Sequence, residues 1–431
     1  MSNLINWYRA QVGTVDRPSG TVPDDSPQER RSRFRRTALL VLAGFALLCL
    51  VRVITGANQL TASGTLTVTL TATMPIAMCG LGGLWSERAG VVNIGLEGML
   101  IMGTLGAGYF GFHYGVWAGV LGATVLGMLG GALHAFATVV VGVDHIVSGV
   151  AINIIALGVA GFLAEAWFSA LEGGGPTQSP PLPTPPEIDL LFIADPMNTL
   201  EEKHWFFISD LAAVVEMFTK NLSVLVLIGL VLIFGSTWAL WRTRIGLRLR
   251  SCGEAPSAAE TLGVNVYRYK FVAVLISGAC AGLGGAMLSM VSSSGFQVGQ
   301  TGGRGYIGLA AMIFGNWRPV GMFLGSTLFG YTQALPLREG TVTLHGLLLL
   351  VVVILFAFGL FQLVRGARSS GLASLVFAGL FLAWYLTTDE VAREFTTMAP
   401  YVMTLLVLAF ASQRLRMPAA DGQIYRKGSA G

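Results

Sequence analysis

Twelve apolar segments divide this chain, and they constrain its fold more than any other feature of the sequence. Most of them reach the roughly 20 residues that a helix needs to cross the hydrocarbon core of a bilayer. Helices satisfy their own backbone hydrogen bonds inside lipid. We therefore predict an all-α, polytopic transmembrane bundle of about 10–12 membrane segments. The apolar segments cover residues 39–50, 65–84, 94–113, 116–141, 146–168, 222–241, 271–291, 304–316, 319–337, 344–364, 371–387 and 398–412.

The composition also indicates a membrane protein. Charged residues make up 12% of the chain, about half of their share in soluble proteins. The 56 glycines are close to twice the usual share. Pairs of glycines four residues apart, which let helix backbones approach closely, occur at 115/119, 127/131, 278/282 and 321/325. The net charge of +4 lies mostly in loops that flank membrane segments, so nucleic acid is not expected as a partner.

One of the apolar segments, 304–316, is too short to cross a bilayer, and it follows a Gly-Gly pair. It is therefore expected to be half of a broken helix. The stretch 292–306, SSSGFQVGQTGGRGY, is polar and rich in glycine. Its Gln297 and Arg304 either meet a hydroxyl-rich substrate in the translocation path or belong to a hinge loop.

The distribution of basic residues predicts the topology. With both chain ends in the cytoplasm, 21 of the 27 Lys and Arg residues fall on the cytoplasmic side, as the positive-inside rule requires. Residues 1–36 then form a cytoplasmic tail, because no clean cleavage site follows the first apolar segment. Residues 37–413 form the membrane domain and 414–431 a second cytoplasmic tail.

The polar segment 242–270 is placed in the cytoplasm by its six basic residues. Pro256 suits the first position of a helix and Gly263 the left-handed residue after its end. A short helix over 257–262 would place Ala258, Ala259 and Leu262 on one face. The segment is either a solvated loop or a small helix that lies in a groove of another protein.

Three polar residues are expected at membrane depth, where they are costly unless they have a partner or face a cavity. Asn93 and Glu97 are four residues apart and would share a helix face. Both either lie on the translocation path or its inner gate, or orient the helix through an interhelical hydrogen bond. Asn153 either lines the path or bonds across helices. Asp144 is expected to cap the helix that follows it.

The external loop, 171–221, contains PPLPTPP and then an amphipathic stretch over 204–218 that includes Trp205, Phe206 and Phe207. The proline-rich half is expected to be extended. The loop is either a landing site for an external binding protein or a cap on the bundle.

Two motifs resemble ABC-importer inner-membrane permeases of the branched-chain amino acid, ribose and nucleoside type. SERAGVVNIGLEGM, at 86–99, is similar to the signature that follows their second apolar segment. GEAPSAAETLGV resembles their cytoplasmic coupling loop, with Ala255 where an Asn is usual. The tail DGQIYRKG is also similar. The coupling-loop residues that match are Gly253, Glu254, Pro256, Ala258, Ala259 and Gly263.

This resemblance implies a permease subunit in a bacterial plasma membrane that forms the path for a small polar solute, a nucleoside or a simple sugar. It also implies three kinds of partner: an ATP-binding cassette ATPase subunit, a second permease chain, and an external substrate-binding protein. ATP and Mg²⁺ would bind the ATPase, and this chain would carry no cofactor and no metal. The short helix at 256–262 would transmit closure of the ATPases to the path.

Motif absences agree with a subunit that is not an enzyme. The sequence contains no GxxxxGK[ST], HExxH or GxSxG motif. The alternative function is an ion-gradient-driven secondary carrier, which would need acidic or histidine relays within the membrane. Glu97 and Glu165 are nearly the only acidic residues that the apolar segments offer for such a relay.

Overall fold

The computed structural model describes residues 27–338, 340–392, 394–395, 398 and 415–428. In this part of the chain the structure is mostly helical, with two strands of two residues each, which confirms the all-α prediction. Seven of the described helices are long and apolar enough to cross a membrane. The expected segment 398–412 lies outside the described residues, apart from residue 398.

The remaining eleven apolar segments each correspond to a helix of the central bundle or its margin. They are α2 (Pro27–Thr55), α3 (Ser63–Arg88), α4 (Leu96–Tyr114), α5 (Val116–Ala135), α6 (His145–Phe168), α9 (Val224–Arg242), α12 (Val266–Met287), α13 (Arg304–Phe314), α14 (Pro319–Ala334), α15 (Gly340–Val364) and α16 (Arg368–Thr387). Two π-helical turns, Phe136–Val141 and Leu288–Ser292, extend α5 and α12.

The core of the bundle lies around α3 and α12, which are the most deeply buried of the candidate spans. Glycines allow α5 to pack directly on α12. A Cβ atom at Gly127 would lie 2.5 Å from the carbonyl oxygen of Gly278 and 2.5 Å from the Cα of Gly282. These two predicted glycine pairs therefore form one backbone contact. Gly115 does not pack in this way, because it has a positive φ of 87° and nothing lies near its absent side chain.

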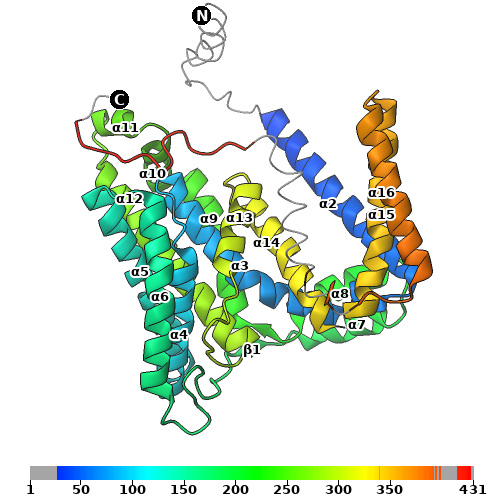
Figure 1. Cartoon of the computed structure of the whole chain (residues 1–431), viewed down its shortest axis with the longest axis horizontal. Coiled ribbons are helices and arrows are strands. Elements are labelled where there is room, and N and C mark those ends of the chain that lie inside the picture. Colours follow the sequence, from blue (N-terminus) through cyan, green and yellow to red (C-terminus); the bar gives the residue numbers. More distant parts are fainter. Residues whose placement is uncertain (1–26, 339, 393, 396–397, 399–414, 429–431) are drawn as a thin grey trace, which may run out of the picture.

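One end of the bundle carries the short helices α10 (Arg244–Glu254) and α11 (Pro256–Thr261), and we call it the coupling end. Figure 1 shows the start of α2 and the red C-terminal tail at this same end. The helices α7 (Leu191–Glu201) and α8 (Ile208–Thr219) lie at the opposite end, near the paired strands β1 (Glu187–Ile188) and β2 (Leu222–Ser223).

The loop 171–221 is more ordered than a simple connection, because α7 and α8 form a helical hairpin within it. The amphipathic stretch predicted over 204–218 forms α8, whereas α7 was not predicted. A buried ion pair joins α8 to α2: Arg52 Nε lies 3.1 Å from Asp210 Oδ1. Thr61 Oγ1 donates a hydrogen bond to the same carboxylate. The loop thus fastens the first helix to the bundle.

Helices α15 and α16 form a hairpin at the edge of the molecule, on the side where α2 lies (Figure 1). Their apolar side chains are mostly exposed, in keeping with a lipid-facing position. α15 packs against the end of α2 and the turn that follows it, where Leu347 and Leu350 lie against Val51 and Leu60, and against the turn after α14.

Candidate functional site

The first site element is the start of α13, which begins near the middle of the bundle. Gly308 packs against the backbone of α3 between Ile76 and Gly80, close to the midpoint of that 26-residue helix. Arg304 lies one turn earlier. Gly303 precedes the helix with a φ of 80°, a left-handed conformation that favours glycine. The prediction of a short helix interrupted at depth is confirmed, since α13 has 11 residues.

Glu97, in the first turn of α4, caps this half-helix. Its two carboxylate oxygens accept hydrogen bonds from the backbone N–H groups of Gly303, at 3.0 Å, and Gly305, at 2.6 Å. A negatively charged group at a helix N-terminus is favoured because the unpaired N–H groups and the helix dipole are positive there. Glu97 therefore fixes the broken helix to α4.

Asn93 does not share a helix face with Glu97, contrary to the prediction. α4 begins only at Leu96, so Asn93 belongs to the connection 89–95, which has a turn at each end. Its Nδ2 donates to Ser277 Oγ on α12 at 2.8 Å, and its Oδ1 accepts from Gly95 N. This segment runs inward along α12, because Lys270 Nζ donates to Gly90 O nearer the coupling end. The four-residue spacing was misleading because the helix had not yet started.

Asn153, on α6, connects three elements. Its Oδ1 accepts from Gly98 N at 2.7 Å, while its Nδ2 donates to Ile94 O and to the hydroxyl oxygen of Tyr306 on α13. Asn153 is almost fully buried, whereas Tyr306 is 47% exposed. Of the two predicted roles, the contacts show the bond across helices.

Arg304 and its neighbours form a polar cluster at the same depth. Arg304 Nε donates to Gln333 Oε1 on α14 at 3.1 Å, and its Nη1 donates to the carbonyl oxygens of Gln300 and Thr301. Gln300 Nε2 in turn donates to Ser289 Oγ. Gln297 lies farther along the loop, exposed and paired with Gln178 in a short bridge. The structure therefore separates Gln297 from the Arg304 cluster.

These groups give one face of the bundle a polar surface at mid-depth. We call it the α13 surface; it comprises the residues Gln300, Gly302, Gly303, Arg304, Tyr306 and Gln333, all of them at least partly exposed. A charged or polar side chain at this depth is costly in hydrocarbon. The surface is therefore suited to a water-filled path or to contact with another protein.

At the coupling end, α11 has the predicted form. Pro256 is its first residue, and Gly263 follows its end with a φ of 80°. The predicted common face is wrong in one respect. Ala259 is only 2% exposed and packs against the chain's own Cys252 and Val266, whereas Ala258 is exposed and Leu262 is 84% exposed. The outward surface of α11 is thus made by Ala258 and Leu262.

The end of α10 packs on the turn between α3 and α4. A Cβ at Gly253 would lie 3.0 Å from the backbone nitrogen of Gly90, so only glycine allows this approach. Glu254 lies 3.8 Å from the guanidinium of Arg88, the last residue of α3. Arg88 also donates to the carbonyl oxygen of Trp317, between α13 and α14. The predicted residues Gly253 and Glu254 therefore connect the coupling segment to the bundle.

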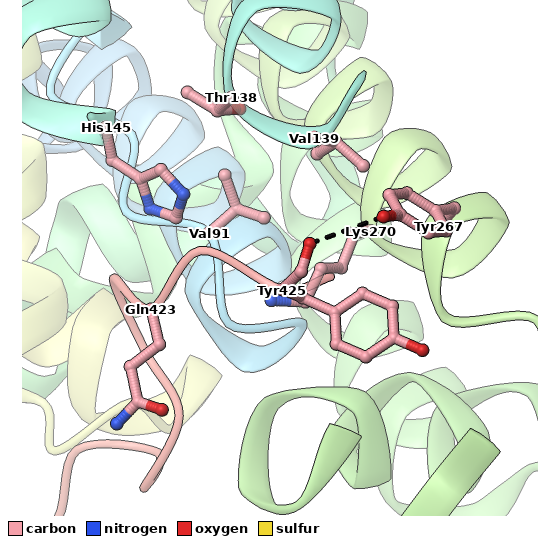
Figure 2. Close-up of a pocket in the computed structure, with 8 residues that line it drawn as sticks. All are labelled: Val91, Thr138, Val139, His145, Tyr267, Lys270, Gln423 and Tyr425. Atoms are coloured by element: carbon pink, nitrogen blue, oxygen red, sulfur yellow. Dashed lines mark hydrogen bonds between the residues drawn. The ribbon is translucent and has the colours of Figure 1, made fainter. Parts of the chain in front are cut away.

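The C-terminal tail adds a layer to this end. Together with the ends of α5, α6 and α12 it encloses a cavity of about 10 Å³, which is about the size of one water molecule. Figure 2 shows Gln423 and Tyr425 of the tail beside His145, Lys270 and Tyr267. Asp421 is buried nearby, where burial raises its pKa to about 7; Lys270 and Arg88 oppose this effect.

Other polar contacts could not be read from the sequence pattern. Glu87, buried near the end of α3, accepts a hydrogen bond from Trp317 Nε1 at 2.6 Å. His134 contacts Ser148 and the carbonyl oxygen of Val92.

Asp144 caps α6 as predicted, through the N–H groups of Ile146 and Val147. Within the described residues, no three His, Cys, Asp or Glu side chains are grouped to hold a metal ion.

Comparison with known proteins identifies the family. Residues 65–358 match the family described as branched-chain amino acid transport system / permease component. The nucleoside ABC transporter permease protein NupC of Lactococcus lactis subsp. cremoris is 32% identical over 82% of this chain and 93% of its own length. The guanosine ABC transporter permease protein NupQ of Bacillus subtilis is 31% identical, over 84% and 95%.

A putative glucose ABC transporter permease protein, TsgC13 of Haloferax volcanii, is 32% identical over 66% of this chain and 80% of its own length. No solved structure matches the chain significantly. The family match excludes the ion-driven carrier that the sequence left open. The chain is a multi-pass membrane protein that belongs to the branched-chain amino acid transport system / permease component family of ABC transporter permeases.

Proposed function

We propose that this chain is the permease subunit of an ABC importer for nucleosides, and that the α13 surface lines its translocation path. The nucleoside and guanosine permeases that it resembles over most of their length support this substrate class. The observation that carries the path assignment is the polar surface at mid-depth, which lipid would not tolerate.

The chemistry of the α13 surface suits a nucleoside. Tyr306 presents a half-exposed aromatic ring, on which a nucleobase can stack. The guanidinium of Arg304 and the amide of Gln333 lie on the same side of α13 and α14, bonded to each other. They supply hydrogen-bonding groups for the base edge or the ribose hydroxyls. Gln297, Asn93, Glu97 and Asn153 instead shape the path from behind or at its margin.

The energy must come from partner subunits. We infer that an ATP-binding cassette ATPase, with its ATP and Mg²⁺, docks on the outward face of α11, where Leu262 is exposed. A second permease chain would close the path opposite the α13 surface, and an external binding protein would deliver the solute at the opposite end. The chain itself would carry no enzymatic activity and no cofactor.

The same proposal orients the chain. The coupling end, with the segment 242–270 and both tails (1–36 and 414–431), faces the cytoplasm of a bacterial cell. The membrane domain covers 37–413, and the hairpin of α7 and α8 within 171–221 faces outward. The distribution of Lys and Arg supports this orientation.

The subunit composition is tested by tagging this chain, extracting it gently from its native membrane, and identifying by mass spectrometry the proteins that come with it. We expect an ATPase with a GxxxxGK[ST] motif and a sister permease. A Leu262→Glu variant is expected to lose the ATPase, whereas a Met417→Glu variant, at an exposed position of the C-terminal tail, keeps it. Repeated recovery of the wild-type chain alone in several mild detergents would refute the proposal.

A further inference from the structure

The C-terminal tail, residues 415–428, runs from the turn between α13 and α14 to α11. It begins against that turn, where Arg416 N donates to Asn316 Oδ1 at 2.8 Å. Asn316 and Trp317 both have positive φ angles, of 56° and 52°, so this turn is held in a conformation that non-glycine residues rarely adopt. The tail thus contacts the end of the broken helix that carries the α13 surface.

The middle of the tail lies over the α3–α4 turn and the end of α10. Ala420 N donates to Gly253 O at 2.9 Å, and Ala419 N donates to the carboxylate of Glu254 at 3.2 Å. A Cβ at Gly90 would lie 3.1 Å from Ala420 O, so the tail is in close contact with the bundle here. Ala420 is 5% exposed, which is low for a residue so near a chain end.

The last part of the tail is bonded to α11. The hydroxyl of Tyr425 donates to Glu260 Oε2, and Gly428 N reaches the same oxygen at 3.5 Å. The ring of Tyr425 packs beside Ala259 and lies 5.2 Å from the ring of Tyr267, between centroids. The tail therefore covers the inward side of α11 and leaves Ala258 and Leu262 exposed.

A helix as short as α11 is not stable alone, since even isolated helices of about 12 residues are marginal. Its six residues keep their position only through the contacts around them. The tail supplies contacts on the side away from the expected ATPase, and its other end contacts the α13–α14 turn. A movement of α11 would therefore reach α13 through the tail as well as through α10 and α12.

We propose that residues 416–428 are a strap that couples α11 to the α13–α14 turn, with Tyr425 and Glu260 as its positioning residues. This inference rests on the proposed function. The strap does not bind the solute or the nucleotide. It holds α11, which would contact the ATPase, at a fixed position relative to α13, which borders the path.

The test uses the complete complex, reconstituted in proteoliposomes with its binding protein, and measures tritiated guanosine uptake and ATP hydrolysis together. Tyr425→Ala and Glu260→Ala are expected to lower the guanosine taken up per ATP hydrolysed, by about 2- to 30-fold, the usual range for residues that carry coupling. ATP hydrolysis and the subunit composition should be retained. Glu260→Gln keeps an acceptor oxygen and is expected to restore most of the coupling.

Met417→Ala is the matched control, because Met417 lies in the same tail with a side chain that is 55% exposed. It should behave as the wild type. If Tyr425→Ala and Glu260→Ala both leave the guanosine uptake per ATP unchanged, the proposal of a coupling strap is overturned. Joint loss of the ATPase subunit and of both activities would also overturn it, because the tail would then serve docking rather than coupling.

A second readout does not depend on the solute. Spin labels at Ser257 and Arg318, both exposed, report the distance between α11 and the α13–α14 turn. In the wild-type complex we expect one narrow distance distribution with and without ATP, and in Tyr425→Ala a broader one. Equal widths would contradict the strap even if guanosine were not the transported solute, whereas absent uptake by the wild type would count against the proposed function alone.

Discussion

Removing the carboxylate of Glu97 gives the most direct test of how the broken helix is held. In Glu97→Ala, the N–H groups of Gly303 and Gly305 lose their acceptor inside the bundle. Leaving a buried donor without a partner costs about 1–3 kcal/mol. Only the Gly305 donor is fully buried, since Gly303 is partly exposed, so we expect the free energy of unfolding to fall by roughly 1–3 kcal/mol.

Glu97→Gln should cost less, since the amide keeps one acceptor oxygen and loses the other. The change is measured by reversible SDS unfolding in mixed micelles, with helicity and tryptophan fluorescence followed together. Glu165→Gln is the control: Glu165 is also an acidic residue of a membrane helix, but it is exposed on α6. A Glu97→Ala variant as stable as the control would refute the assignment of Glu97 as the cap of α13.

Three other predictions follow from packing, a buried ion pair and a buried carboxyl. Gly127→Ala should destabilise the bundle by about 1–3 kcal/mol, because the new methyl group meets the backbone of α12; SDS unfolding with no loss would contradict this contact. Arg52→Ala should cost about 3–5 kcal/mol, because it leaves Asp210 charged and buried. Replacing both Arg52 and Asp210 by Leu should lower the free energy of unfolding much less. An equal loss in the single and the double variant would argue against a stabilising ion pair. The Asp421 carboxyl has a higher pKa in the folded chain than its ordinary 3.8, so docking of the tail is strongest at low pH and weakens as pH rises towards about 7. Amide exchange over 416–425, corrected for intrinsic rates, should therefore show more protection near about pH 5 than near about pH 8, and Asp421→Asn should reduce the difference.

The membrane architecture could be predicted because it depends on local properties of the sequence. Apolar runs of sufficient length become helices in lipid whatever their neighbours are. α11 could also be predicted from the local sequence, because Pro256 and Gly263 act through their own backbone preferences. The Asp144 cap was predictable for the same reason.

Contacts that depend on tertiary structure could not be predicted in this way. The partners of Glu97 lie more than 200 positions away, at 303 and 305. Asn93 was placed on the helix of Glu97 because the two residues are four positions apart, and this spacing does not reveal that α4 begins only at Leu96. Ala259 was grouped on one face with Ala258 and Leu262 because residue spacing describes which residues share a side of a helix, and it does not show which of them the tail covers.

The candidate site residues also divide into those that the local sequence indicates and those that only the fold brings together. Arg304 could be singled out because it lies in a polar, glycine-rich stretch between apolar segments. Gln333 and Tyr306 were not identified, since one amide and one phenol in apolar helices are common. Only the fold brings them beside the start of α13.

The central claim is that ATP drives nucleoside import through this chain, and one measurement tests it most directly. The complete complex, purified through this subunit, is placed in proteoliposomes with its binding protein, ATP and Mg²⁺, and the entry of tritiated guanosine is followed. We predict uptake that requires ATP, is reduced by unlabelled adenosine or uridine but not by glucose, and falls in Tyr306→Ala. ATP-independent entry, or uptake of labelled glucose with none of guanosine, would contradict the account.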